Sequence, residues 1–274
     1  MSNRIKEEFL QKSEPVRLNK YLSEAGVCSR READRLIETG RVTVDGQCAQ
    51  TGMRIVPGQV VKVGNKVVSK QDEMIVLAVN KPRGIVCTEE RRERDSIVRF
   101  LNYPVRVTYI GRLDKDSHGL LLMTNNGDII NKMMRAANKH EKEYKVTVDK
   151  EITEDFLKKM AAGVPILDTV TRPGTVKKIG KYTFSIILTQ GLNRQIRRMC
   201  EALGYEVKDL LRVRVMNITL DGLKDGQYRK LADQELNELY DQLKDSSALP
   251  GGKYQEQWAA TQDNRTRHGK GKKR

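Results

Sequence analysis

Apolar residues near the start of the chain recur first at helical spacing and then in alternation. Residues 17–26 predict a short helix, and residues 29–40 predict a second helix that Ser29 caps. Alternating apolar positions predict a strand and a hairpin, over residues 42–46 and 59–68. The pattern therefore predicts a small domain of two helices and short strands.

A longer series of strand and helix patterns follows. The predicted strands begin with a near-continuous apolar run and cover residues 75–79, 105–110, 120–124, 142–149, 181–191 and 210–220. Helical spacing predicts helices over residues 128–137, 153–163, 193–204 and 233–244. Strands outnumber helices and several follow one another as hairpins do, which favours an α+β fold over a doubly wound α/β fold. We therefore expect a mixed, mostly antiparallel β-sheet with flanking helices.

Shifts in composition divide the chain into four parts. Residues 1–14 are charged and are expected to form a flexible leader. Residues 15–72 form the small domain, and the sequence QDEM marks a linker to a larger domain over residues 73–245. Residues 246–274 carry seven basic and two acidic residues with little periodicity, and we expect a disordered basic tail there.

The charge balance changes this picture from a generic globular protein to one with a polyanionic partner. The formal net charge is +15, from 51 basic and 36 acidic residues, which indicates nucleic acid. The four cysteines are widely spaced and the three histidines lie far apart, so neither disulfides nor a metal site is expected. The chain lacks an apolar run of signal-peptide or membrane-span length. We expect a cytoplasmic protein with no membrane contact.

Basic residues gather on the two predicted helices of the small domain. They are Arg17, Lys20, Arg30, Arg31 and Arg35, and one side of the helix pair could hold phosphates. Acidic residues are nearly as frequent in this segment, so charge alone leaves a solvated helix pair as the alternative. The sequences NKYLSEAG, SRREADRLI and GRVTVDG, however, resemble the small RNA-binding module (alpha-L type) first recognised in a small-subunit ribosomal protein. That resemblance implies binding of structured RNA.

The sequence GRLDKDSHGLLLMT places one carboxylate, Asp114, between an arginine and a lysine after a predicted strand. Glycoside hydrolysis usually needs two carboxyls, and Asp116 fits a turn better than a second catalytic acid. Metal-dependent nuclease sites need several acidic ligands, and no such cluster is evident. A single nucleophilic carboxylate stays open, provided that an arginine keeps it ionised. Arg197 borders the apolar stripe of the helix predicted at 193–204, so its side chain could reach such a carboxylate. The alternative is that Arg194, Arg197 and Arg198 only form a solvent-exposed face of that helix.

Further information on function comes from three motifs: GRLDKDSHGLLLMTNNGD, KEYKVTV and QGLNRQIRRMCEALG. They resemble the RsuA/RluB/RluE/RluF family of rRNA pseudouridine synthases, and most closely its 23S rRNA enzymes. The resemblance implies that Asp114 is the catalytic nucleophile or base and that Arg197 pairs with it. It also implies that Tyr144 stacks on the uracil and takes the proton from its C5, and that Arg112 fills the space left by the flipped base. Arg194 and Arg198 are then expected to bind RNA.

The implied reaction is an isomerisation of uridine within RNA. Neither water nor a redox or group-transfer step enters it, so neither a second carboxylate nor a cofactor is expected. The target base must leave its stack, which is easiest in loops and bulges, and the expected partner is a 23S rRNA stem-loop bound by a monomer. The alternatives are a non-catalytic RNA-binding or ribosome-assembly protein of the same fold, and an RNA glycosidase. An intact set of Asp114, Tyr144 and Arg197 argues against the first, and the missing second carboxylate argues against the other.

Overall fold

A computed structural model describes residues 15–69, 74–90 and 92–246. The expected leader, most of the linker and all of the expected tail except Ser246 lie outside the described residues. The N-terminal module contains the helices α2 (Leu18–Glu24) and α3 (Arg30–Glu38). Its strands are β1 (Val16–Arg17), β2 (Val42–Val44), β3 (Gln47–Cys48), β4 (Arg54–Ile55), β5 (Val61–Val63) and β6 (Lys66–Val67).

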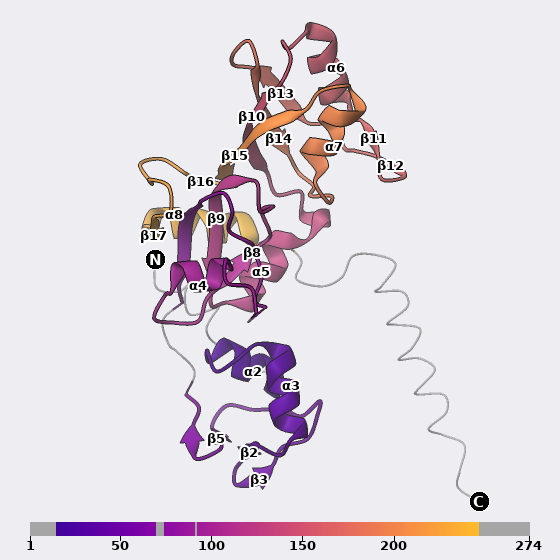
Figure 1. The fold of residues 1–274 in the computed structure, drawn as a ribbon. Helices are drawn as coiled ribbons and strands as arrows, with labels where there is room; N and C mark the ends of the chain where they lie inside the picture. Colours follow the sequence, from indigo (N-terminus) through magenta and orange to yellow (C-terminus); the bar gives the residue numbers. More distant parts are fainter. Residues whose placement is uncertain (1–14, 70–73, 91, 247–274) are drawn as a thin grey trace, which may run out of the picture.

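The two helices form where the sequence predicts them. Ser29 caps α3, because its hydroxyl oxygen accepts a hydrogen bond from the amide of Glu32 at 3.2 Å. Ala33 and Ile37 on α3 are buried, as the helical spacing predicts, and belong to one core with Leu18 and Leu22 of α2. The small domain thus has its own hydrophobic core, and it lies below the larger domain in Figure 1.

The larger domain is built on one nine-stranded sheet. Its strands are β7 (Val76–Lys81), β8 (Thr108–Ile110), β9 (His118–Thr124), β10 (Lys142–Val148), β13 (Thr175–Lys178), β14 (Thr183–Leu188), β15 (Val207–Val215), β16 (Ile218–Thr219) and β17 (Tyr228–Lys230). Its helices are α4 (Ile97–Leu101), α5 (Gly127–Met134), η1 (Ala136–Asn138), α6 (Glu154–Ala162), α7 (Gln195–Ala202) and α8 (Asp233–Leu243). A two-stranded hairpin of β11 (Pro165–Ile166) and β12 (Thr169–Val170) stands apart.

The strand order in this sheet is β13-β14-β10-β15-β9-β7-β17, with β16 beside β15 and β8 beside β9. All pairs are antiparallel except β15 with β9. The prediction of a mixed, mostly antiparallel α+β sheet is therefore confirmed. The single strand predicted over residues 210–220 is wrong in one respect. Met216 takes a left-handed conformation (φ 54°), so the chain turns there and returns as β16.

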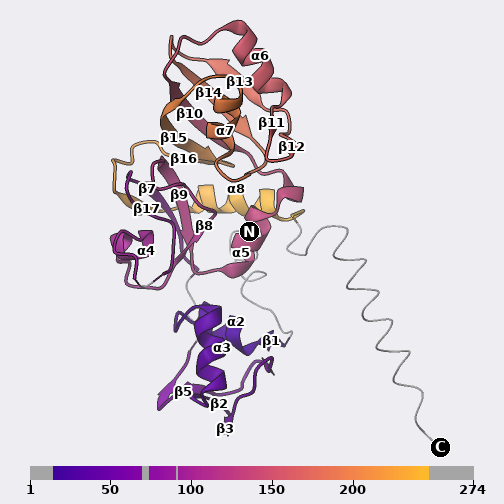
Figure 2. The same ribbon diagram turned by 45° about the vertical axis from the view of Figure 1, so that its right-hand side comes forward.

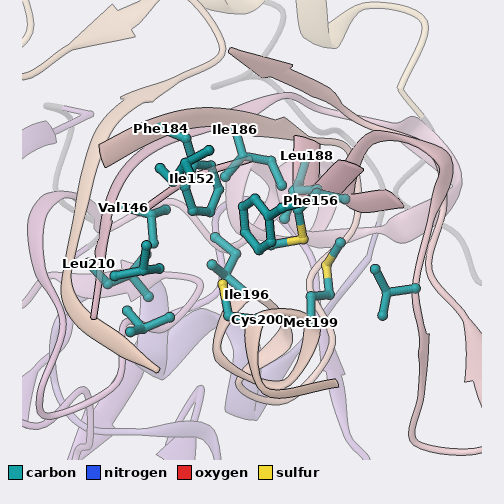
Figure 3. Packing of buried hydrophobic residues seen from close by; sticks show 14 of the residues in the cluster. Val146, Ile152, Phe156, Phe184, Ile186, Leu188, Ile196, Met199, Cys200 and Leu210 are labelled. Atoms are coloured by element: carbon teal, nitrogen blue, oxygen red, sulfur yellow. The ribbon is translucent and has the colours of Figure 1, made fainter. Parts of the chain in front are cut away.

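The sheet runs through two halves of the larger domain (Figure 1; Figure 2), and their buried residues belong to separate cores. In one half, β7 and β9 are buried on both faces, because α5 and α8 cover one face while α4 and the loops that carry Val107 and Leu113 cover the other. In the other half, α6 and α7 pack on β10, β14 and β15. Figure 3 shows this second core, where Phe156 and Ile196 meet the side chains of β14.

Direct contacts join the small module to the larger domain. The ammonium of Lys20 lies 2.8 Å from Asp128 at the start of α5, and it also pairs with Glu24 at 3.4 Å. Arg106 donates a hydrogen bond to the hydroxyl of Ser23 at 3.4 Å. Helix α2 is thereby held against the end of the sheet that carries β8 and α5.

Candidate active site

Asp114 lies in the loop between β8 and β9, and its neighbours fix that loop from both sides. Leu113 and Ser117 are buried, at 6% and 1% exposure. The amide of Leu113 donates to the sulfur of Cys87 at 3.5 Å, and the amide of Ser117 donates to the carbonyl of Asp114 at 3.1 Å. The side chain of Asp114 stays 33% exposed. The carboxylate of Asp114 is thus partly exposed at the surface, on a loop whose flanking residues are buried.

Two arginines of the α7 region converge on this loop, but their pairing differs from the expected one. Arg194 places Nη1 3.7 Å from the carboxylate of Asp114 and 3.3 Å from that of Asp116. Arg197, expected to pair with Asp114, lies 3.2 Å from the carboxylate of Asp116 and also donates to the hydroxyl of Ser117 at 3.3 Å. The cause is local: Arg194 precedes α7 in a left-handed conformation (φ 49°), which turns it toward the loop.

Asp116 has a larger role in the site than the turn position predicted for it. It does occupy a turn, as predicted, but it also joins the two arginines. Partial burial raises the pKa of Asp116, and the hydrogen bonds of Arg194 together with the charge of Arg197 more than offset this, so that its pKa lies below the usual value. Asp116 therefore holds Arg194 beside Asp114 as a stable anion. The two-residue spacing in RLDKDS was the available signal.

Tyr144 lies on β10 at the junction of the two halves of the sheet. Its ring packs against the core beneath α6 and α7 and also against the core that contains Leu113. Tyr144 and the Asp114 loop therefore face the same junction. Arg112, two residues before Asp114, is exposed, whereas Arg198 is partly buried and donates to the carbonyl of Asn193 at 3.1 Å.

Two buried basic side chains near this junction, Lys81 and Arg212, were not predicted from the sequence. Lys81, at the end of β7, is fully buried and donates to the carbonyls of Pro82 and Ile85 at 2.8 Å and 2.7 Å. Burial lowers the pKa of Lys81, while the charges of Asp114 and Asp116 act in the opposite direction. Arg212, on β15, is only 2% exposed. A charged residue inside an apolar strand pattern, as in VNKP and LLRVRV, is the signal that marks both.

On the small module, a cavity of about 270 Å³ gathers basic side chains. Its lining includes Arg17, Lys20 and Arg30, which were predicted, and Arg54, which was not. Arg31 and Arg35 are exposed on α3 outside this lining, and Arg35 pairs with Glu32 at 3.3 Å. The cavity offers donors suited to a phosphate group.

Two general features bear on the class of site. Among the described residues, no cluster of three or more His, Cys, Asp or Glu side chains could hold a metal ion. Within the same residues, no helix is long and apolar enough to cross a membrane. The site thus combines two carboxylates, Asp114 and Asp116, with two arginines, and the chain also carries a basic cavity on its small module.

Comparison with known proteins specifies the class. Residues 75–202 match the family model described as RNA pseudouridylate synthase, and residues 16–61 match the S4 domain. The chain is 55% identical over 235 residues to the dual-specificity RNA pseudouridine synthase RluF of Escherichia coli K12, covering 85% of this chain and 81% of that one. It is 35% identical over 232 residues to the ribosomal large subunit pseudouridine synthase B of Bacillus subtilis, covering 81% and 95%.

The structural comparison agrees with the sequence comparisons. A crystal structure of a pseudouridylate synthase superimposes with a TM-score of 0.60 at 27% identity, covering 82% of this chain and 99% of that chain. The chain belongs to the RsuA/RluB/RluE/RluF family of RNA pseudouridine synthases, and it is an enzyme of that type with an RNA-binding S4 domain.

Proposed function

We propose that this enzyme converts a specific uridine of 23S ribosomal RNA to pseudouridine, with Asp114 as its catalytic carboxylate. The observation that carries the proposal is the placement of Asp114, which is partly exposed on a rigid loop with Arg194 3.7 Å away. The 23S target is supported by the similarity to RluF and to a ribosomal large subunit synthase. Asp114 acts at C1′ of the ribose, as nucleophile or as base, while the bond from C1′ to N1 breaks.

The other site residues handle the detached base. Tyr144 stacks on the uracil while it rotates and takes the proton from C5 as the new bond from C1′ to C5 forms. Arg112 occupies the space that the flipped nucleotide leaves in the RNA. Arg194 places its positive charge beside the carboxylate of Asp114, and Arg197 acts through Asp116 and Ser117, which it binds. The reaction rearranges one nucleotide and adds no atom, so these side chains suffice without a cofactor.

The S4 module positions the RNA. Arg17, Lys20 and Arg30 around the small cavity hold backbone phosphates of a stem, while the larger domain takes a uridine from the adjacent loop. Arg31, Arg35, Arg194 and Arg198 add phosphate contacts along the path. The substrate is a 23S rRNA stem-loop, bound by a monomer in the cytoplasm, where ribosomal RNA is assembled.

Product analysis tests this function. Purified enzyme is incubated with a 23S rRNA transcript, and the nucleosides are separated after complete digestion. The proposal expects pseudouridine and no free uracil. Unchanged RNA would favour a non-catalytic RNA-binding protein, and released uracil would favour a glycosidase. Mapping pseudouridines in ribosomal RNA with and without the gene then identifies the position.

A further inference from the structure

Arg212 has an unusual environment for a charged residue. It lies in the middle of β15, and its guanidinium Nε donates to the carbonyl oxygen of Leu120 at 2.6 Å. Its Nη2 is buried and has no hydrogen-bond partner in the described part of the chain. An unpaired buried donor destabilises the folded protein, and more so when it is charged. Such a group suggests that a ligand supplies the missing acceptor.

The register of the sheet shows which way Arg212 faces. Where β10 pairs with β15, Glu143 of β10 lies opposite Arg214, and the next residue of β10, Tyr144, lies opposite Arg212 because of a β-bulge. The bulge inserts one residue of β15 between these pairs, so Arg212 and Arg214 face opposite sides of the sheet although they are two residues apart. Arg214 faces Glu143, with which it forms an ion pair at 3.0 Å. Arg212 therefore lies on the same face as the ring of Tyr144.

The charge of the Arg212 guanidinium also acts on two groups near the active site. Its charge acts on the thiol of Cys87, whose sulfur binds the amide of the residue before Asp114. Its charge also acts on the ammonium of Lys142, two residues before Tyr144 on β10. Close approach of β9 to β15 permits this position, because a Cβ on Gly119 would collide with the backbone oxygen of Arg212. Arg212 thus lies between the Tyr144 strand and the support of the Asp114 loop.

We propose that Arg212 is a further catalytic residue, whose free Nη2 donates a hydrogen bond to a carbonyl oxygen of the target uracil. This inference rests on the proposed function. When the bond from C1′ to N1 breaks, its electron pair stays with the base and spreads onto O2 and O4. A buried, preorganised cation stabilises that charge where water cannot. After rotation, C5 bonds to C1′, the C5 proton leaves and N1 gains a proton, so the reaction balances as an isomerisation.

The first arm of the test changes the enzyme. Single-turnover rates are measured at saturating stem-loop RNA for Arg212→Gln and Arg212→Lys, with Arg214→Gln as the matched control on the opposite face of the same strand. Removing one such donor lowers a rate by about 100-fold or more. We expect that loss for Arg212→Gln, a smaller loss for Arg212→Lys, and a change of less than about threefold for Arg214→Gln, with RNA affinity retained throughout. Equal rates for Arg212→Gln and wild type would overturn the inference.

The second arm changes the substrate and does not depend on how the variants fold. The target uridine is replaced by 2-thiouridine or 4-thiouridine, because sulfur is a weaker acceptor than oxygen. Wild-type enzyme should slow by about tenfold or more with one of the two, and Arg212→Gln should show no further slowing. Equal wild-type rates on all three RNAs would refute a contact to either oxygen. If wild type forms no pseudouridine on unmodified RNA, the proposed function itself fails. That result differs from one in which wild type is active and Arg212→Gln reacts at the same rate, which refutes only the role of Arg212.

Discussion

Lys142 offers a quantitative test of the buried positive charge near Tyr144. Burial, with a further contribution from the charge of Arg212, lowers the pKa of Lys142 from 10.5 to about 8. At about 1.4 kcal/mol per pKa unit, the protonated lysine destabilises the folded state by about 3 kcal/mol at neutral pH. Lys142→Met removes the charge and keeps an apolar stem of similar length, so it should raise the free energy of unfolding at pH 7 by about that amount.

The sign of the pH dependence follows from the same shift. Below pH 8 the lysine is protonated in both states, and the destabilisation is constant. Between about 8 and 10.5 the folded protein loses the proton first, so the wild-type free energy of unfolding rises relative to the variant. The stability difference between the two proteins should therefore shrink over that interval and nearly vanish above it. Cys200, whose pKa burial raises to about 12, is common to both proteins and cancels in the difference.

The assay is urea unfolding of both proteins, followed by circular dichroism at several pH values from neutral to alkaline. Lys145→Met is the control, because it removes an exposed ammonium from the same strand and should change the free energy of unfolding by less than about 0.5 kcal/mol. A difference between wild type and Lys142→Met that does not vary with pH would refute the reasoning, as would a destabilised variant at pH 7.

Three further predictions follow from the site and its support. Arg194→Met removes the ion pair of Asp114 and should slow single turnover by about fivefold, as expected for a partly exposed pair. Arg198→Met, the control, should leave the single-turnover rate within about twofold of wild type. Equal effects of the two substitutions would refute the role given to Arg194. Tyr144→Phe should bind RNA normally yet slow sharply in a single-turnover assay, because stacking survives and the hydroxyl does not; full activity would leave stacking alone. Gly119→Ala should lower the free energy of unfolding by at least about 2 kcal/mol in urea, because of its φ of 102° and the collision with Arg212, while Gly191→Ala, in open space, should have little effect.

Local features of the fold were predictable from the sequence because they depend on neighbouring residues. The cap at Ser29 forms as expected. The helix predicted from residue 153 also forms, and Thr153 caps it by accepting a 3.1 Å hydrogen bond from the amide of Phe156. The strand β17 was missed, because its three residues are mostly exposed and carry no apolar alternation. The turn at Met216 was missed because a methionine at positive φ is not a turn signal.

The candidate site also has some features that the sequence predicts and others that it does not. The motifs identified Asp114, Tyr144 and Arg197 as a group. In the structure Arg197 pairs with Asp116 in the Asp114 loop, and Tyr144 packs against the core that contains Leu113. The exact ion pairs were not predictable, since they depend on the left-handed backbone at Arg194. The orientation of Arg212 depends on a bulge in the pairing with β10, which no residue spacing within β15 reveals.

The proposed function depends above all on Asp114 as the catalytic carboxylate. The most direct test is a single-turnover assay of Asp114→Asn on the 23S rRNA stem-loop, with RNA affinity and thermal unfolding measured in parallel. The amide has the shape of the carboxylate but not its charge, so the account predicts no detectable pseudouridine, RNA affinity within about threefold of wild type and an unchanged unfolding temperature. Pseudouridine formation by this variant within about tenfold of the wild-type rate would contradict the account.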